Sequence, residues 1–388
     1  HEVGVLGVSG AGEAVRLGGG CGSLCGAGAK VVVIDDGRSF EHSAKLQGGA
    51  FVEFTMSSGF CLNPFSMIDQ AQAAEDEDYL LDCMAMLKAI INQMSRHINV
   101  LDDTERGLID GAVNQVWEEH GSKGSIDLVI AALEATGNVL ASNLGIAMRP
   151  FSSGGTYGRF FQGEVSFELQ AQLTVFELSD LSAREELRSV VLTAIMFMSQ
   201  QMMRKLDRSI PKALLLDEAW QMLRGGAMAD FIETYARTCR KYGASLVTAT
   251  QSLNDYYKSA GSIAALENSD WFVILQQKPE TIADFKKHDR FEMDDYTDAL
   301  LRSLKRNGFE YSDIMIKGPD TLAVGRLVLD PYSATLFSSS PRTFAAIDAL
   351  IAEGMSMDEA IERIAFPDNP EKWVSNFVDA DEIAIAAE

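Results

Sequence analysis

Residues 212–220, KALLLDEAW, contain a short apolar run (ALLLD, 213–217) that ends in two acids and leads into a helical pattern. Four other runs are similarly short, apolar and bounded by polar or glycine residues: KVVVID (30–35), LTVFEL (173–178), ASLVTAT (244–250) and WFVILQ (271–276). Such runs are typical of strands in a parallel sheet that is covered on both faces. Helical patterns at 183–206 and 227–242 lie between them, so the sequence predicts an α/β, doubly wound domain.

Length and composition are those of a globular chain with a large core. Of its 388 residues, 47% are hydrophobic and 23% are charged, which allows one large domain with an insertion, or two domains. The net charge of −23 argues against a broad electrostatic grip on nucleic acid, although a local basic pore is compatible with it. Five scattered cysteines favour a reducing compartment over a disulfide framework. No apolar run is long enough to span a bilayer, and because the chain begins at His1 we expect a piece of a longer protein.

A helical region interrupts the predicted sheet between the runs at 30–35 and 173–178. Its pattern is helical almost throughout, and Asp103 and Ser125 are candidate helix N-caps. Beyond the last strand, a strand or two is expected at 320–337 and a helical hairpin at 342–364. The predicted division is a core formed by 1–69 and 146–330, an inserted all-α subdomain at 70–145 and a C-terminal helical segment at 331–388.

Asp217 and Glu218 directly follow the leucines of the opening stretch. Two adjacent acids at the end of a buried strand are what a hydrolase of Mg-nucleotides needs. In that hypothesis Asp217 holds Mg²⁺ through water, and Glu218 orients and deprotonates the attacking water. The alternative is a pair of helix N-cap residues, because a helical pattern begins there. Asp35 and Asp36 end the run at 30–35, where capping competes with a contact to a ribose or to a metal-bound water.

Gln251 follows the run at 244–250, at the expected edge of the sheet. An amide there can contact the γ-phosphate or the attacking water; an ordinary polar residue that closes a strand is the alternative. Upstream, the helical pattern carries Arg237, Arg240 and Lys241. An arginine that reaches a neighbouring subunit's nucleotide stabilises charge on the transferring phosphoryl group, whereas a solvated helix face is the simpler interpretation.

The stretch GVSGAGEA, residues 7–14, has the glycine spacing of a phosphate-binding loop. The order of phosphate loop, second strand, acidic strand and glutamine strand is that of a RecA-like P-loop motor. In place of the lysine and the hydroxyl residue of such loops stand Glu13 and Ala14, so a carboxylate opposes the phosphates and a Mg²⁺ ligand is missing. Backbone N–H groups can still bind an anion there. The predicted nucleotide-binding residues are Gly7, Ser9, Gly10, Ala11, Gly12, Glu13 and Ala14.

Glycines continue downstream of this loop, where a helix should follow. They stand at positions 18, 19, 20, 22, 26 and 28. Each interior glycine costs a helix about 1 kcal/mol relative to alanine, so the composition disfavours the helix. Two explanations of the altered loop are open: a local error in the sequence over residues 13–22, or genuine decay of the site.

Several motifs together resemble the TraC/VirB-type ATPases of conjugative type IV secretion systems. They are VIDDGRSFEHSAKLQGGAFVEF (33–54), CLNPFSMID (61–69), TYGRFFQG (156–163), ALLLDEAWQML (213–223), RTCRKYGASLVTATQSLNDYY (237–257) and DPYSATLF (330–337). The resemblance covers nearly the whole chain. It implies a RecA-like P-loop NTPase core with an all-α insertion, in a cytoplasmic hexamer at the inner face of the membrane.

The resemblance also implies cofactors, partners and an activity. ATP and Mg²⁺ are the expected cofactors, and other secretion components are the expected partners, with membrane association through them or through an N-terminal region. The carried-over residues are Asp217, Glu218, Gln251, and Arg237 or Arg240 as the arginine that faces a neighbour. The sequence thus predicts an ATP-driven motor domain that powers channel or pilus assembly and substrate transfer, with a degenerate loop that impairs ATP binding.

Two other functions compete with this prediction. A non-hydrolysing structural subunit of the secretion complex is favoured by Glu13 and Ala14. A DNA translocase or helicase of the same superfamily is less favoured, because the net charge and the resemblance predict no strong direct binding of nucleic acid.

Overall fold

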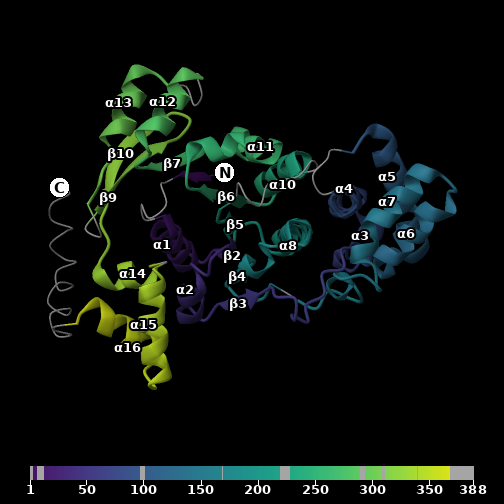
Figure 1. The fold of residues 1–388 in the computed structure, drawn as a ribbon, viewed down its shortest axis with the longest axis horizontal. Coiled ribbons are helices and arrows are strands. Elements are labelled where there is room, and N and C mark those ends of the chain that lie inside the picture. The colour runs from purple at the N-terminus through teal and green to yellow at the C-terminus, as the bar shows by residue number, and fades with distance from the viewer. Residues whose placement is uncertain are drawn as a thin grey trace.

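The computed structural model describes residues 3–6, 13–96, 101–167, 169–218, 228–288, 293–307, 311–338 and 340–367. One ten-stranded sheet lies at the centre, with helices on both of its faces (Figure 1). Its strands are β1 (Val3–Leu6), β2 (Lys30–Asp35), β3 (Ala50–Glu53), β4 (Leu173–Glu177), β5 (Lys212–Leu216), β6 (Ala244–Thr250), β7 (Trp271–Leu275), β8 (Arg306–Asn307), β9 (Tyr311–Lys317) and β10 (Leu322–Leu327).

The helices fall into three groups along the described part of the chain. Those of the core are α1 (Glu13–Gly26), α2 (Glu41–Leu46), α8 (Glu185–Lys205), α10 (Met228–Lys241), α11 (Ala260–Asn268), α12 (Pro279–Lys287) and α13 (Asp295–Ser303). Those of the insertion are α3 (Gln70–Glu75), α4 (Glu77–Ser95), α5 (Asp103–His120), α6 (Ile126–Ala135) and α7 (Val139–Met148). Those near the C-terminus are α14 (Pro331–Leu336), α15 (Pro341–Ala352) and α16 (Met357–Ala365).

The sheet is parallel over most of its width. Its strand order is β10-β9-β7-β1-β6-β5-β2-β4-β3, with β8 paired to β9. All neighbours from β7 to β3 run parallel, whereas β9 pairs antiparallel with β7, β8 and β10. The predicted mainly parallel α/β fold is therefore confirmed. The five predicted runs correspond to β2, β4, β5, β6 and β7, and β10 lies in the region expected to hold a strand or two, while β1, β3, β8 and β9 were not predicted as strands.

Alternate residues of the central strands contact opposite layers of helices. In β2, Val32 and Ile34 belong to a hydrophobic cluster that also contains side chains of α8 and α10, whereas Val31 and Val33 pack with Leu17 of α1. All four β2 side chains are fully buried. Burial of each such side chain contributes about 1.5–3 kcal/mol. Both faces of β2 are thus apolar, which explains its unbroken hydrophobic run.

Helix α1 forms despite its glycines. Leu17 and Cys21, one helical turn apart, are buried against the sheet. Gly18 lies so close to the ring of Phe337 that a Cβ added to it would be 2.3 Å from Phe337 Cδ1. Packing of this kind outweighs weak helix propensity, so a helix forms here although the glycine composition disfavours it.

The insertion is joined to the core by buried contacts. Helices α3–α7 lie at one end of the molecule in blue (Figure 1), and their buried side chains share a cluster with those of α8. Tyr79 Oη donates to Gln201 Oε1 at 2.9 Å, and Gln93 Nε2 donates to Ser189 Oγ at 2.6 Å. These bonds connect α4 to α8, so the insertion packs against the core instead of standing apart from it.

Two connecting stretches, 61–66 and 158–166, are bonded to each other and form what we call the neck of the insertion. Leu62 N donates to Phe160 O at 2.6 Å. The buried Asn63 side chain donates to Gly124 O at 3.0 Å and to Gly163 O at 2.9 Å. The neck accounts structurally for the LNPF and YGRFF motifs.

Local caps start the helices of the insertion. Ser125 caps α6, as predicted, by accepting from Leu128 N at 3.3 Å. The cap of α5 is Asp102 and not the predicted Asp103, because Asp102 and Glu105 form a reciprocal capping box.

The C-terminal helices pack beside α1 and α2 (Figure 1). The ring of His42 in α2 stacks on Phe344 of α15 with centroids 4.1 Å apart, and His42 Nε2 lies 3.1 Å from Asp348 Oδ1. The predicted helical hairpin corresponds to α15 and α16, and the region expected to hold a strand or two contains β10 followed by α14. Among the described helices, none combines the length and the hydropathy needed to cross a bilayer.

Candidate functional site

The carboxyl edge of the sheet brings Asp217, Glu218 and Gln251 together. Asp217 N donates to Ile34 O at 2.9 Å, which continues the pairing of β5 with β2. Gln251 follows β6, the other neighbour of β5, and its Nε2 donates to Glu218 Oε1. An acid pair and an amide that are far apart in the sequence therefore meet at one point.

Glu218 adopts a left-handed backbone conformation, with φ of 50°. For a residue with a Cβ this costs about 1–3 kcal/mol, and such residues cluster at functional sites. The unusual backbone conformation of Glu218 accompanies its side-chain hydrogen bond with Gln251. Residues 219–227, where a helix capped by Asp217 or Glu218 would begin, lie outside the described residues. The alternative interpretation of the pair as helix N-caps therefore stays a prediction.

The carboxyl of Asp217 has an unusual proton affinity. Burial, followed by the charge of Glu218, raises the pKa of Asp217 to about 7. Asp36 and Glu177 act in the same direction, while Glu218 N, which lies 3.1 Å from Asp217 Oδ1, acts against them. A divalent cation near this carboxyl would favour its ionised form, because it offsets the same repulsion.

Asp217 is the last of four acids at the same level across four neighbouring strands, which we call the acid row: Glu53, Glu177, Asp35 and Asp217. Glu53 is in register with Glu177, and Glu177 with Asp35. Asp217 follows β5 at the level of Asp35, since the preceding residues of β2 and β5 are paired. Residues in register on parallel strands project to the same face, so these carboxylates would repel one another without compensating donors.

Asp35, the last residue of β2, and Asp36, which follows it, have separate partners. Asp35 is fully buried; its Oδ2 accepts from Phe40 N at 3.0 Å, and its Oδ1 has no partner among the described residues. Burial, and then Glu177 and Asp217, raise the pKa of Asp35 well above its ordinary value. Asp36 pairs with Arg188 of α8 at 2.5 Å. Asp35 thus binds the backbone of Phe40, the residue before α2, without forming a helix cap, whereas Asp36 forms an ion pair.

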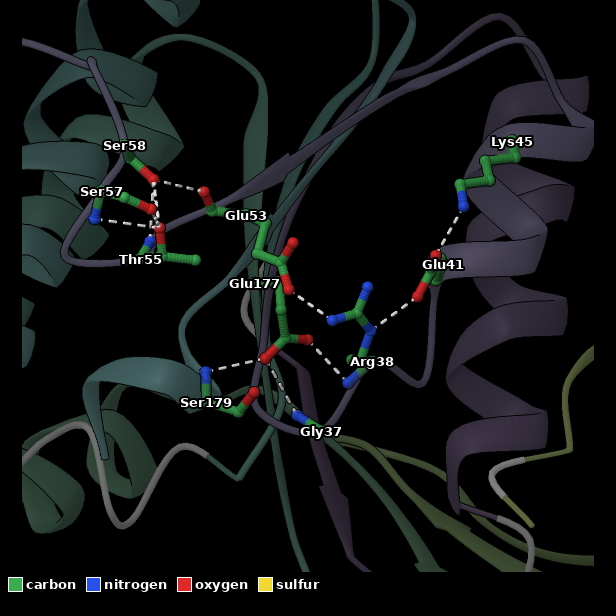
Figure 2. A network of polar contacts seen from close by, with 10 residues as sticks. All are labelled: Gly37, Arg38, Glu41, Lys45, Glu53, Thr55, Ser57, Ser58, Glu177 and Ser179. Carbon is green, nitrogen blue, oxygen red and sulfur yellow. Dashed lines mark hydrogen bonds and ion pairs between the residues drawn. The ribbon is translucent and has the colours of Figure 1, made fainter. Parts of the chain in front are cut away.

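Glu177 and Arg38 belong to this edge but were not predicted. Glu177 is buried at the end of β4 and faces the loop between β2 and α2 (Figure 2). Arg38, in that loop, donates through Nη1 to Glu53 and through Nε to Glu41 Oε2, the latter at 2.7 Å. Their only sequence signal is a polar residue at a strand end, which becomes informative once the register of β2, β3 and β4 is known.

The predicted phosphate loop connects β1 to α1. Gly7, Ser9, Gly10, Ala11 and Gly12 lie outside the described residues, and for Glu13 and Ala14 only the helical backbone is described. β1 lies between β6 and β7 and parallel to both, so its connection to α1 leaves the same edge of the sheet as Gln251. A strand, a glycine-rich connecting sequence and a helix in this order are the setting of a phosphate-binding loop.

Comparison with known proteins identifies the family. The model of the TraG P-loop domain matches residues 136–367, more than half of the chain. The chain belongs to the TraG P-loop domain family. It is also 26% identical over 388 residues to Protein TraC of Escherichia coli (strain K12), an alignment that covers 94% of this chain and 42% of that protein. The chain thus spans less than half the length of this curated relative.

Solved structures share the fold of this TraG P-loop domain. VirB4 of Thermoanaerobacter pseudethanolicus superimposes with a TM-score of 0.69 at 16% identity, covering 86% of this chain and 90% of that one. The plasmid coupling protein TrwB in complex with ADP and Mg²⁺ gives 0.56 at 12% identity, covering 84% and 85%. The predicted RecA-like P-loop fold and the resemblance to TraC/VirB-type ATPases are therefore confirmed.

Arg237 of α10 lies away from the acid pair within one TraG P-loop domain. The end of α10 is next to the start of β5, because Lys212 Nζ donates to Tyr242 O at 3.2 Å. Arg237 is exposed, and the side chain of Arg240 lies outside the described part of the chain. This end of α10 is opposite the edge that carries Glu218, so Arg237 does not meet its own chain's acid pair.

A metal at this edge would depend on ligands from a substrate. Within the described ranges, no group of three or more His, Cys, Asp or Glu side chains is arranged to hold a metal ion. Mg²⁺ is commonly held by one or two carboxylates together with waters and phosphate oxygens. Asp217, with Glu218 beside it, fits that mode in the TraG P-loop domain, since both offer oxygen ligands at the edge of the sheet where β1 ends.

Proposed function

We propose that this domain is the ATP-driven motor of a type IV secretion or conjugation ATPase, which powers pilus or channel assembly and substrate transfer. The observation that carries the proposal is the contact of Gln251 with Glu218, beside Asp217, at the edge where β1 leads into α1. Family membership and the ADP and Mg²⁺ bound by the TrwB neighbour support a nucleotide at this edge.

Each residue of the edge has a distinct part in the proposed hydrolysis. Asp217 would hold Mg²⁺ through water, and the metal would supply positive charge beside the phosphates. Glu218 orients and deprotonates the attacking water, while Gln251 keeps Glu218 in place and responds to the γ-phosphate. Arg237 or Arg240 acts on the nucleotide of a neighbouring subunit, and the position of Arg237 away from the acid pair of its own chain supports this role.

The residues at the start of α1 set the limit of this activity. Replacing a lysine by Glu13 changes the local charge by two units beside the phosphates, and Ala14 has no hydroxyl for Mg²⁺. We expect ATP binding to be weak or absent in the chain as written, with the rest of the motor site retained.

The decisive experiment restores the loop. ATP affinity and turnover are measured for the parent chain and for the double variant Glu13→Lys, Ala14→Ser. The double variant is expected to bind and hydrolyse ATP, and adding Glu218→Gln to it should leave binding intact while turnover falls by about 100-fold or more. Glu118→Lys, an exposed change of the same charge on α5, is the control and should have no effect. A restored chain that neither binds nor hydrolyses ATP would contradict the proposal.

A non-hydrolysing structural subunit is the second candidate, and Glu13 and Ala14 are the observation that favours it. It predicts that the parent and the restored chain both lack turnover while still assembling with partner components. The same measurements therefore separate the two candidates.

The whole protein's assembly is a further part of the proposal. We infer a hexamer at the cytoplasmic face of the inner membrane, together with other secretion components. The match to TraC and the fold shared with VirB4 and TrwB support this inference. Because the chain spans 42% of the length of TraC, the full-length protein is the material for testing it.

A further inference from the structure

Glu177 binds backbone and not solvent. Its side chain is buried at the end of β4 and accepts three main-chain N–H groups (Figure 2). Arg38 N lies 2.6 Å from Oε2, while Gly37 N and Ser179 N lie 3.3 and 2.7 Å from Oε1. Both carboxylate oxygens are therefore engaged with the loop between β2 and α2 and with the turn after β4.

The β2–α2 loop, residues 36–40, has a conformation that such bonds are needed to hold. Gly37 has φ of 134° and Arg38 has φ of 61°, and a left-handed conformation is unfavourable for a residue with a Cβ. Glu177 is bonded to the N–H groups of these same two residues. The start of the loop has a second anchor, since Asp36 pairs with the nearly buried Arg188.

This loop adjoins the proposed metal ligand. Asp35, which immediately precedes it, lies in register with Glu177, and Asp217 is bonded through its backbone to Ile34 of the same strand. Asp36 and Glu177 are also close enough to Asp217 for their charges to affect its carboxyl. A shift of the loop would consequently move charges and backbone beside Asp217.

We propose that Glu177 is a positioning residue for the hydrolytic site: it holds the β2–α2 loop, and through the loop it sets the surroundings of Asp217. The proposal rests on the proposed ATPase function and adds to it a residue that touches neither nucleotide nor metal. The neighbouring Glu53 differs, because its carboxylate meets only the exposed guanidinium of Arg38 among the contacts drawn in Figure 2.

Glu177→Gln keeps the shape of the side chain and removes one acceptor, so an NH₂ group faces N–H donors. We would make it in the loop-restored chain (Glu13→Lys, Ala14→Ser), beside Glu53→Gln as the matched control in the adjacent strand. We expect Glu177→Gln to lower kcat about tenfold and to change the KM for ATP by less than about twofold. Losses of this size are typical when a residue that orients a metal ligand, without binding the metal itself, is replaced. Amide exchange at Gly37 and Arg38 should become faster, and Glu53→Gln should leave kcat, KM and exchange near the parent values.

Gly37→Ala provides a second route to the same effect and guards against a Glu177 variant that fails to fold. No atom lies within 4 Å of the added Cβ, so the change acts through the backbone conformation of the loop alone. It should lower kcat in the same way, and combining it with Glu177→Gln should lower kcat by much less than the product of the two effects.

The possible results separate the two proposals. If the loop-restored chain with Glu177 intact has no ATP turnover, the proposed function fails and the positioning role fails with it. If that chain is active but Glu177→Gln and Gly37→Ala leave kcat unchanged, or raise KM alone, only the positioning role is overturned. The positioning role is supported if kcat falls in both variants, amide exchange at Gly37 and Arg38 becomes faster, and Glu53→Gln changes neither.

Discussion

At the scale of single residues, the carboxyl edge of the sheet brings several negatively charged side chains close together. The acid row places Glu53, Glu177, Asp35 and Asp217 side by side, and each of the first three has donors from the chain itself. Asp217 is bonded to the N–H of the next residue, and its pKa is raised to about 7. It is therefore the member of the row whose charge a bound cation would stabilise most directly.

Replacing Asp217 by Asn should make folding stability less dependent on pH. An acid whose pKa is about 7 in the folded chain and near 4 in the unfolded chain binds its proton more tightly when folded. The stability linked to that proton is present at low pH and is lost as the pH rises from about 4 through about 7. Asp217→Asn, which carries no charge, should equal the parent near pH 4 and exceed it by about 2–4 kcal/mol at pH 8.

Denaturant midpoints at several pH values between 4 and 8 would measure this difference. The exposed Asp180, changed to Asn, is the control and should show no comparable trend. A difference between Asp217→Asn and the parent that stays constant with pH would contradict the raised proton affinity.

At the scale of elements, close approach decides which glycines α1 needs. Gly18 lies against the ring of Phe337, whereas Gly20 has no atom within 4 Å of an added Cβ. Both are interior positions of one helix, so they share the cost of low helix propensity and differ in their surroundings. The junction of α1 with the C-terminal helices is thus the place where the glycine composition has a structural reason.

Gly20→Ala and Gly18→Ala should therefore have opposite effects on stability. Gly20→Ala is expected to stabilise the chain by about 0.5–1 kcal/mol through helix propensity alone. Gly18→Ala gains the same propensity but forces Phe337 aside, and should destabilise the chain by about 1–3 kcal/mol. Thermal unfolding of the two variants beside the parent measures both signs; equal stabilisation by both would show that Phe337 does not pack on Gly18.

The neck of the insertion depends on one buried amide. Asn63→Asp keeps the size of the side chain but sets carboxylate oxygens against the carbonyls of Gly124 and Gly163, where the amide had donated. We expect a loss of about 2–4 kcal/mol in the free energy of unfolding, because buried acceptors lose their donors and a charge is buried. The exposed Asn143, changed to Asp, is the control. If both variants had a similarly small effect on urea unfolding, the hydrogen bonds of Asn63 would not be what stabilises the neck.

At the scale of the whole molecule, the hydrophobic core is divided into clusters and the chain carries a large negative net charge. One hydrophobic cluster runs through the insertion helices and one face of the sheet, and separate clusters lie on the other face and under the C-terminal helices. The net charge of −23 applies to the whole chain, and its effect on a polyanion is repulsion over about a Debye length, about 8 Å at physiological salt.

This charge predicts weak binding of nucleic acid. A fluorescent single-stranded or double-stranded oligonucleotide should bind more weakly than about 10⁻⁵ M at physiological salt, as judged by anisotropy. The loop-restored variant, which is less negative by two charges, should behave in the same way. Tight binding that weakens steeply as salt is raised would instead favour the DNA translocase alternative.

The order of strands and helices follows from local patterns, which are visible in the sequence. β2 and β5 are apolar on both faces, so their runs are unbroken and easily found, and Ser125 marks a helix start by its own side chain. The acid pair and Gln251 were predicted at one edge because parallel strands all end on the same side of a sheet. Their contact depends on β5 and β6 being neighbours in the sheet, which the structure shows.

What only the tertiary structure decided concerns pairs of segments that are remote in sequence. The short strands β1 and β3 have too few residues to show a period, and α1 forms against its propensity because Leu17, Cys21 and Phe337 are buried around it. Glu177 becomes a partner of Arg38 only through the register of β2 with β4. A sequence determines local periodicity by itself, whereas register and close approach depend on how all elements pack together, and these placed Glu177 at the site.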